Sequence, residues 1–299
     1  MSLSKFVVFS CLIWNFSQAS EIIPGSGAIA KLIIDQDSEV SLEVSMQIGD
    51  IQIMNTEVEG GEFVRLSLLG FHTSNDIGSP VLPEIHKLIE IPQNAMPRIE
   101  IISEEVEYYS LSDYGIESPI FPHQPSLSKS QTPDDVPFEW NEVLYQTDAF
   151  MEHELISVEI KGDLRSLRLA NLVIRPVDYN AVSGIIRVTK SVDFIIHYDG
   201  ADITETQALK EAYYSPYFES VYRQVANYKP LNDRDDLVSY PVTYVIITNP
   251  IFENTLSEFI DWKIQKGFTV VVGNTSEIGS STSAIKSYIQ DLYENPTDA

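Results

Sequence analysis

The chain has 299 residues, 43% of them hydrophobic and 21% charged, which is the composition of a globular protein long enough for two domains. Wholesale disorder is excluded at this hydrophobic content. The 19 Lys and Arg residues are outnumbered by 44 Asp and Glu residues, for a formal net charge of -25. Such a surface repels phosphate backbones and anionic lipids, and no basic stripe offsets it, so nucleic acid is excluded as an expected partner.

The first 19 residues have the pattern of a secretory signal peptide. Lys5 supplies a positive charge, and the apolar run at 6–16 is followed by small residues at the usual positions of a cleavage site. We expect cleavage between Ala19 and Ser20, and therefore a secreted or extracellular protein. The apolar run is shorter than the roughly 20 residues of a spanning helix and no later stretch is long enough, so no membrane span is expected.

The only cysteine, Cys11, lies inside that apolar run and leaves with it, so the mature chain is expected to have neither a disulfide nor a thiol nucleophile. The glycines at 25–30 match a dinucleotide-binding fingerprint in letters only, because they follow a cleavage site rather than a strand. His153 and Glu154 begin like a zinc-binding helix but lack its second histidine, so His153 is expected to be a surface or sheet side chain. We expect no catalytic residue, no cofactor and no metal.

Between residues 29 and 109 apolar side chains alternate with polar ones, which predicts half-buried β-strands. The runs at 41–54 and 62–71 follow this rule, and Gly60-Gly61 between them is typical of a tight hairpin turn. On one face of the first run lie Leu42, Val44, Met46 and Ile48.

Residues 112–141 differ from their surroundings, with five prolines among Ser, Gln and Asp and little apolar periodicity. This composition predicts a long exposed loop. Trp140, Tyr145 and Phe150 near its end are expected to pack onto a sheet rather than to face a glycan or a peptide. Strand patterns then return, so the chain up to residue 200 is mainly β. It is expected to form an antiparallel β-sandwich. The later strand-like runs are 155–162, 165–180 and 184–200.

The pattern becomes helical at 204–228, and a polar stretch at 229–239 marks a domain boundary. The remaining sequence alternates strand, helix, strand and helix, with apolar strands at 243–248 and 268–272. That order predicts the opening of an α/β domain with a parallel sheet. Two strands and two helices do not complete such a domain, so we expect the chain to stop inside one.

Three stretches together resemble the precursors of gingipain-type cysteine peptidases. They are GSPVLPEIHKLIEIP at 78–92, the segment at 157–200, and YVIITNPIFENTLSEFIDWKIQKGFTVVV at 244–272. The first two are similar to parts of that family's prodomain, and the third looks like the first strand, helix and second strand of its caspase-like peptidase domain. The resemblance implies three parts: a signal peptide at 1–19, an all-β prodomain at 20–238, and the truncated start of an α/β peptidase domain at 239–299.

For function, the resemblance implies a secreted zymogen. Its prodomain is expected to act as a folding aid and as an inhibitor of proteolysis by its own peptidase domain, which in the full-length enzyme acts on protein substrates. The family's catalytic His and Cys lie later than Ala299, so this chain is expected to be inactive alone. Whether it is a truncated precursor or a natural short protein stays open. The alternative is a free-standing extracellular β-sandwich that binds a protein or a glycan.

Two basic residues are candidate site residues under the same resemblance. If the peptidase is similar to the Arg-specific members, Arg234 in the polar boundary is the preferred maturation site. Lys129 is the only Lys or Arg in the loop at 112–141, and such a loop could carry it into the pocket of an enzyme that accepts basic residues. An ordinary solvated lysine is the competing interpretation.

Overall fold

The computed structural model describes residues 21–23, 29–58, 60–132, 136–151, 153–230 and 242–295. The chain forms two compact units. Unit 1 comprises Met1–Tyr214 and Ser220–Tyr228, and unit 2 comprises Ser215–Glu219 and Lys229–Ala299. Among the described residues, the paired strands of unit 1 run antiparallel and unit 2 has one parallel pair.

The described elements up to residue 228 are mostly strands. The strands are β1 (Glu21–Ile23), β2 (Lys31–Asp37), β3 (Ser41–Gln47), β4 (Ile51–Val58), β5 (Gly61–Leu68), β6 (His72–Thr73), β7 (Pro83–Glu90), β8 (Met96–Ser110), β9 (Ile156–Leu164), β10 (Leu167–Ile174), β11 (Val177–Asn180) and β12 (Ile185–Asp199). The helices are α1 (Glu142–Gln146), α2 (Ile203–Tyr213) and α3 (Glu219–Tyr222), with 3-10 turns at Leu111–Tyr114 and Pro216–Phe218.

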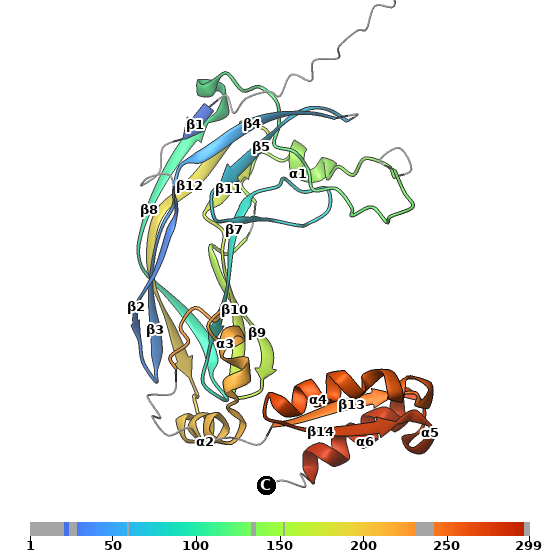
Figure 1. Ribbon diagram of the computed structural model, residues 1–299. Helices are drawn as coiled ribbons and strands as arrows, with labels where there is room; N and C mark the ends of the chain where they lie inside the picture. The colour runs from blue at the N-terminus through green and yellow to red at the C-terminus, as the bar shows by residue number, and fades with distance from the viewer. Residues whose placement is uncertain are drawn as a thin grey trace, which may run out of the picture. The chain divides into compact units, whose positions relative to one another are not determined.

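The long strand β12 organises the largest sheet of unit 1 (Figure 1). β8 pairs antiparallel with β12 from Ile185 opposite Ser110 to Asp199 opposite Met96. β11 pairs with the first part of β12 and β3 with its second part, and β2 lies beyond β3. Because a strand has two edges and β8 occupies one of them, β11 and β3 follow each other along the other edge.

Two further sheets complete unit 1, a four-stranded sheet in the order β6-β7-β10-β9 and a three-stranded sheet in the order β1-β4-β5. Residues of all three sheets meet in one hydrophobic core. The side chains that the sequence pattern assigns to one face of the run at 41–54 belong to it, each no more than 1% exposed: Leu42, Val44, Met46 and Ile48. The predicted antiparallel β-sandwich is therefore confirmed.

The β4–β5 hairpin lies where the two adjacent glycines predict it. Val58 pairs with Gly61, which leaves a two-residue connection between the strands. Gly61 has a φ of +123°, a backbone conformation that residues with a side chain rarely adopt.

The proline-rich segment at 112–141 is only partly the exposed loop that its composition predicts. Residues 126–132 are exposed, but Ile116, Ile120 and Phe121 are buried. The reason is that the first part of the segment pairs with β5 and with the residues before β7, so its apolar side chains enter the core.

The helical prediction at 204–228 is right for α2 and for 216–222, where a 3-10 turn leads into α3, and wrong for 223–228. α3 has only four residues, and the chain then turns toward the edge of β7. Ala226 N–H donates to the carbonyl of Leu88 at 2.8 Å, and the Asn227 side chain bonds both the N–H (2.7 Å) and the carbonyl (2.9 Å) of Glu90. These bonds require backbone that leaves the helix, so they end it.

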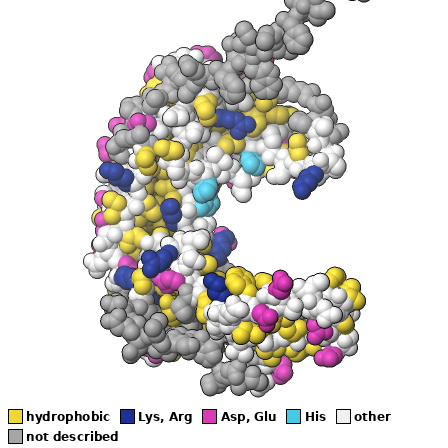
Figure 2. Space-filling model, viewed as in Figure 1, with side chains coloured by type: hydrophobic (Ala, Val, Ile, Leu, Met, Phe, Trp, Pro, Cys, Tyr) yellow, Lys and Arg dark blue, Asp and Glu magenta, His cyan; other side chains and the backbone are white. Residues whose placement is uncertain are grey.

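Unit 2 contains the predicted parallel pair, with β13 (Val242–Thr248) beside β14 (Phe268–Asn274). Its helices are α4 (Ser257–Gln265), α5 (Thr275–Ile278) and α6 (Thr282–Glu294), preceded by a 3-10 helix (Pro250–Leu256). No residue of α4 or α6 is buried, and Figure 2 shows hydrophobic side chains on the visible face of this unit. Tyr217 belongs to this unit, and its ring lies 4.5 Å from that of Phe268, centroid to centroid.

No helix in the described part of the chain is long and apolar enough to cross a membrane.

Candidate functional site

The proline-rich segment is anchored to unit 1 at its start. Val64 on β5 donates its N–H to the carbonyl of Pro119 at 2.9 Å and accepts from the N–H of Phe121 at 2.8 Å. The carbonyl of Phe121 in turn accepts from the N–H of Val81 at 2.9 Å. The segment thus lies between β5 and the chain before β7 as a short extra strand, which explains its buried apolar side chains.

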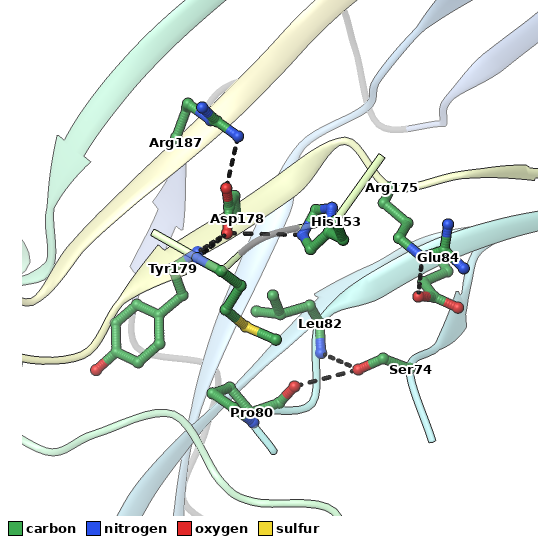
Figure 3. Close-up of polar contacts among 10 residues, drawn as sticks. Ser74, Pro80, Leu82, Glu84, His153, Arg175, Asp178, Tyr179 and Arg187 are labelled. Carbon is green, nitrogen blue, oxygen red and sulfur yellow. Dashed lines mark hydrogen bonds and ion pairs between the residues drawn. The ribbon is translucent and has the colours of Figure 1, made fainter. Parts of the chain in front are cut away.

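The chain before β7, with which the proline-rich segment pairs, is fixed by the hydroxyl of Ser74. Ser74 Oγ donates to the carbonyl of Pro80 at 3.1 Å and accepts from the N–H of Leu82 at 2.9 Å (Figure 3). Farther along, Gly78 N–H donates to the carbonyl of His123 at 2.8 Å. The start of the proline-rich segment is therefore hydrogen-bonded to β5 on one side and to the chain before β7 on the other.

A side-chain amide closes the base of the exposed loop. Gln124 Nε2 donates to the carbonyl of Glu139 at 2.8 Å, and Gln124 Oε1 accepts from the N–H of the same residue at 2.9 Å. Nε2 also donates to the carbonyl of Pro122 at 3.1 Å. An amide is suited to this task because it carries both a donor and an acceptor for one peptide group. We call this pair of bonds between Gln124 and Glu139 the base clamp.

Aromatic side chains from both ends of the loop pack around Phe63 on β5. The ring of Phe63 lies 5.5 Å from Phe121, 5.6 Å from Phe138 and 5.4 Å from Trp140, measured between centroids. The guanidinium of Arg65 lies 3.7 Å from the centroid of the Phe121 ring, and its partial burial lowers the pKa of Arg65. The two ends of the loop therefore share one hydrophobic cluster, with Phe121 from its start and Phe138 from its end.

Tyr145 on α1 belongs to the main core and contacts this cluster through Trp140. Its ring stacks on Trp140 at 4.1 Å, and its hydroxyl donates to the carbonyl of Ile120 at 2.6 Å. Burial raises the pKa of the Tyr145 phenol, so it stays protonated and remains a donor. Both aromatics pack on the sheet, as predicted from the sequence. Phe150, the third, lies 5.9 Å from the Tyr108 ring.

Lys129 lies in a tight turn in the exposed part of this loop. The turn runs from Ser128 to Gln131, with Lys129 and Ser130 at its centre. Gln131 N–H donates to the carbonyl of Ser128 at 3.0 Å, and Gln131 Oε1 accepts from the N–H of Ser128 at 3.0 Å. We call this reciprocal pair the tip clamp. Figure 1 shows the loop projecting beside α1, and Lys129 is exposed on it.

A second polar cluster surrounds Asp178 on β11 (Figure 3). Its carboxylate is 3% exposed and accepts from Arg187 Nη2 at 2.6 Å. It also accepts from the backbone N–H groups of Met151 at 3.1 Å and of Tyr179 at 2.9 Å. His153 Nε2 lies 3.6 Å from the same carboxylate. One buried acid thus ties the chain that follows the loop to β11 and β12.

A cavity of about 360 Å³ opens beside this cluster. Arg175 on its wall donates to Glu84 Oε1 at 2.9 Å and to Ser157 Oγ at 3.1 Å, so both arginines here have a carboxylate partner. No three His, Cys, Asp or Glu side chains among the described residues are arranged to hold a metal ion. The paired charges indicate a structural role for this cluster rather than a reactive one.

Of the candidate site residues named from the sequence, the structure describes Lys129. Ala19, Ser20 and Arg234 lie outside the described residues. Sequence reasoning missed Gln124 and the base clamp, because no pattern in a single sequence marks which peptide group an amide will meet fifteen residues later.

The fold and this site define a class of protein: an all-β unit that presents a clamped loop, followed by a parallel α/β unit. Comparison with family models agrees. The C25 propeptide model (Propeptide_C25) matches residues 30–225, and the model described as Peptidase family C25 matches residues 238–299.

Known relatives match most of the chain. Lys-gingipain HG66 of Porphyromonas gingivalis is 35% identical over 255 residues, which are 85% of this chain and 15% of that protein. Gingipain R2 of the same species is 21% identical over 301 residues, covering 97% of this chain and 39% of that protein. The chain therefore spans well under half the length of the curated relatives it matches.

Two solved structures are similar in fold. A structure described as an insight into the zymogenic latency of gingipain K from Porphyromonas gingivalis superposes with a TM-score of 0.56 at 31% identity, covering 60% of this chain and 99% of that one. A complex of the pro- and mature domains of RgpB from the same species superposes with a TM-score of 0.52 at 16% identity, covering 65% and 95%.

The chain belongs to the gingipain-type C25 peptidase precursors, and residues 30–225 are the prodomain of such a cysteine peptidase zymogen. The comparisons give no support to the alternative of a free-standing binding module.

Proposed function

We propose that this prodomain keeps its own peptidase domain latent by presenting Lys129 to the substrate-binding pocket. The whole protein is then a secreted cysteine endopeptidase zymogen that acts on protein substrates once the prodomain is removed. In this proposal residues 1–19 are the export signal, cut between Ala19 and Ser20, residues 20–238 are the prodomain, and residues 239–299 begin the peptidase domain.

The observation that carries the proposal is the exposed turn at Lys129, held on a loop with a closed base. A pre-formed loop enters a cleft without the ordering cost that a free peptide incurs, so its side chain binds more tightly. Lys129 is also the only Lys or Arg between residues 112 and 141 of a chain whose net charge is -25. Lys-gingipain HG66, at 35% identity, is more similar to this chain than Gingipain R2, at 21% identity. Its name supports a pocket that accepts a lysine side chain.

Replacing Lys129 tests this role directly. Titrating the matching mature peptidase with residues 20–238 is expected to abolish its activity, and Lys129→Ala is expected to weaken that inhibition by about 100-fold or more, because it removes a charged group from a buried pair. The measurement is the inhibition constant from steady-state hydrolysis of a peptide substrate. Full peptidase activity at saturating wild-type prodomain would exclude the inhibitor role.

The matched control is Lys161→Ala. Lys161 is an exposed lysine of β9 that pairs with Glu159, so its loss is expected to change inhibition by less than about twofold. Lys129→Arg separates charge from shape, since a planar guanidinium does not reproduce a compact ammonium. Equal inhibition by wild type and Lys129→Ala would leave the prodomain an inhibitor but remove Lys129 from the mechanism.

Maturation is proposed to cut the polar boundary at 229–239. Its basic residues are Lys229 and Arg234, and a charged, polar stretch between two units is where proteolysis concentrates. For an Arg-specific peptidase the expected new N-terminus is Asp235. N-terminal sequencing after limited proteolysis tests this prediction, which fails if the cuts fall only within residues 40–110 and the boundary stays intact.

A further inference from the structure

The loop carrying Lys129 has two separate sets of hydrogen bonds, and they act at different places. The base clamp joins Gln124 to Glu139, and the tip clamp joins Ser128 to Gln131. A third contact, between the hydroxyls of Ser128 and Ser130 at 3.2 Å, lies inside the turn. An exposed loop on the surface of a peptidase precursor would otherwise be an easy substrate.

The tip clamp surrounds the bond that a lysine-directed peptidase would cut. Such an enzyme hydrolyses the bond after Lys129, and this is the bond between the two central residues of the turn. Ser128 and Gln131, the first and fourth residues of the turn, are bonded to each other in both directions. The Lys129–Ser130 bond is therefore held in the most tightly folded part of the loop.

Peptidases commonly bind substrate backbone in an extended form, as an added strand whose side chains alternate between pockets. A residue at the centre of a turn meets a pocket with its side chain but does not lay its carbonyl carbon against the nucleophile in the required geometry, which is sensitive to shifts of about 1 Å. Cleavage of the Lys129–Ser130 bond then requires the turn to open first.

We propose that the two clamps make this loop resistant to cleavage at Lys129, so that it binds the peptidase as an inhibitor rather than as a substrate; this rests on the function proposed above for Lys129. Gln131 and Gln124 are positioning residues, since they act on the conformation of the Lys129–Ser130 bond and not on the peptidase. The glutamine side chains were not singled out by any sequence pattern, because their role depends on which peptide groups they reach.

Trypsin, which cuts after Lys and Arg, tests the resistance without the matching peptidase. The full chain is digested briefly, and the initial rate of cutting between Lys129 and Ser130 is measured by mass spectrometry. The same bond is measured in a synthetic peptide of residues 124–132, which lacks the Glu139 partner. The protection factor is the cleavage rate in the peptide divided by the cleavage rate in the protein. Each variant is compared with a peptide of its own sequence, so that the sequence preference of trypsin cancels.

The wild-type protection factor is expected to be about 30 or more, since each hydrogen bond contributes roughly fivefold to the closed state. Gln131→Ala removes the acceptor for Ser128 N–H and is expected to lower the factor about fivefold. Gln124→Ala removes both bonds of the base clamp and is expected to lower it about 25-fold. Gln131→Glu keeps an acceptor in place and is expected to stay within about twofold of wild type.

A wild-type protection factor below about 3, or factors for Gln131→Ala and Gln124→Ala both equal to wild type, would overturn the proposal. Far-UV circular dichroism of each variant confirms that unit 1 is intact, because the altered side chains lie on the loop and at its base. The outcome is independent of the inhibition experiment. A protected bond with no effect of Lys129→Ala on inhibition refutes the role proposed for Lys129, and loss of inhibition with an unprotected bond refutes the role of the clamps.

Discussion

Replacing Asp178 with alanine is expected to lower the free energy of unfolding of unit 1 by about 3 kcal/mol, because it removes the acceptor for three donors at a nearly buried position. The Asp178 carboxylate is 3% exposed, and the N–H groups of Met151 and Tyr179 lose their partner along with Arg187. The Arg187 side chain is 40% exposed and can turn to water, so most of the cost falls on the two backbone groups. Urea denaturation of the full chain, followed by far-UV circular dichroism, measures the change.

Asp193→Ala is the matched control on the neighbouring strand. Asp193 is exposed on β12 and accepts a hydrogen bond from Ser103 Oγ at 2.7 Å, which lowers the pKa of its carboxyl group. Because water replaces such a partner readily, its loss is expected to cost less than about 1 kcal/mol. Asp178→Asn keeps an acceptor oxygen and is expected to fall between the two. Equal stability of Asp178→Ala and Asp193→Ala would show that the buried cluster contributes nothing specific.

The strands of unit 1 could be predicted because their information is local. Leu42, Val44 and Met46 alternate with polar residues, and burial of one face follows from the two-residue period of a strand. The hairpin at Gly60-Gly61 is equally local, since the turn needs a residue that tolerates positive φ. These features therefore needed no knowledge of the partner strands.

Features that depend on distant partners were not predictable in the same way. The first part of the proline-rich segment is buried because Phe121 bonds with Val64, 57 residues earlier, and its proline content gave no sign of that partner. The helix after α2 is short because Asn227 bonds to Glu90, and the local pattern of apolar residues favours a longer helix. In both cases long-range backbone bonds override local preference.

The site at Lys129 depends on both local sequence and contacts between distant residues. That it is the only Lys or Arg of its loop is readable from the sequence, and this alone made it a candidate. That it lies in a turn closed by Gln131, on a loop closed by Gln124, is a property of the fold. The residue is thus found from composition, and the hydrogen bonds on which the proposed resistance to cleavage rests come from the fold.

Residues 239–299, produced alone, are expected to show no cooperative thermal unfolding. Within the described part of this stretch no residue of α4 or α6 is buried, and among the residues of β13 and β14 only Thr248 and Gly273 are. Ordering a residue costs about 1.5 kcal/mol of conformational entropy, and so little burial does not offset it. The separated stretch also loses Tyr217, whose ring covers Phe268 and whose hydroxyl donates to the carbonyl of Lys266 at 3.3 Å.

Trp262 makes the measurement direct, because it is the only tryptophan between residues 239 and 299 and the residue is 48% exposed. Its fluorescence in the isolated stretch is expected to match that of a free peptide and to change little on adding urea. The calorimetric scan is expected to be featureless, whereas a folded domain of this size would absorb about 40 kcal/mol at roughly 0.7 kcal/mol per residue. The full chain serves as the control, since unit 1 has its own core and is expected to unfold cooperatively. A sharp calorimetric transition in the isolated stretch would show that the packing within unit 2 suffices without Tyr217.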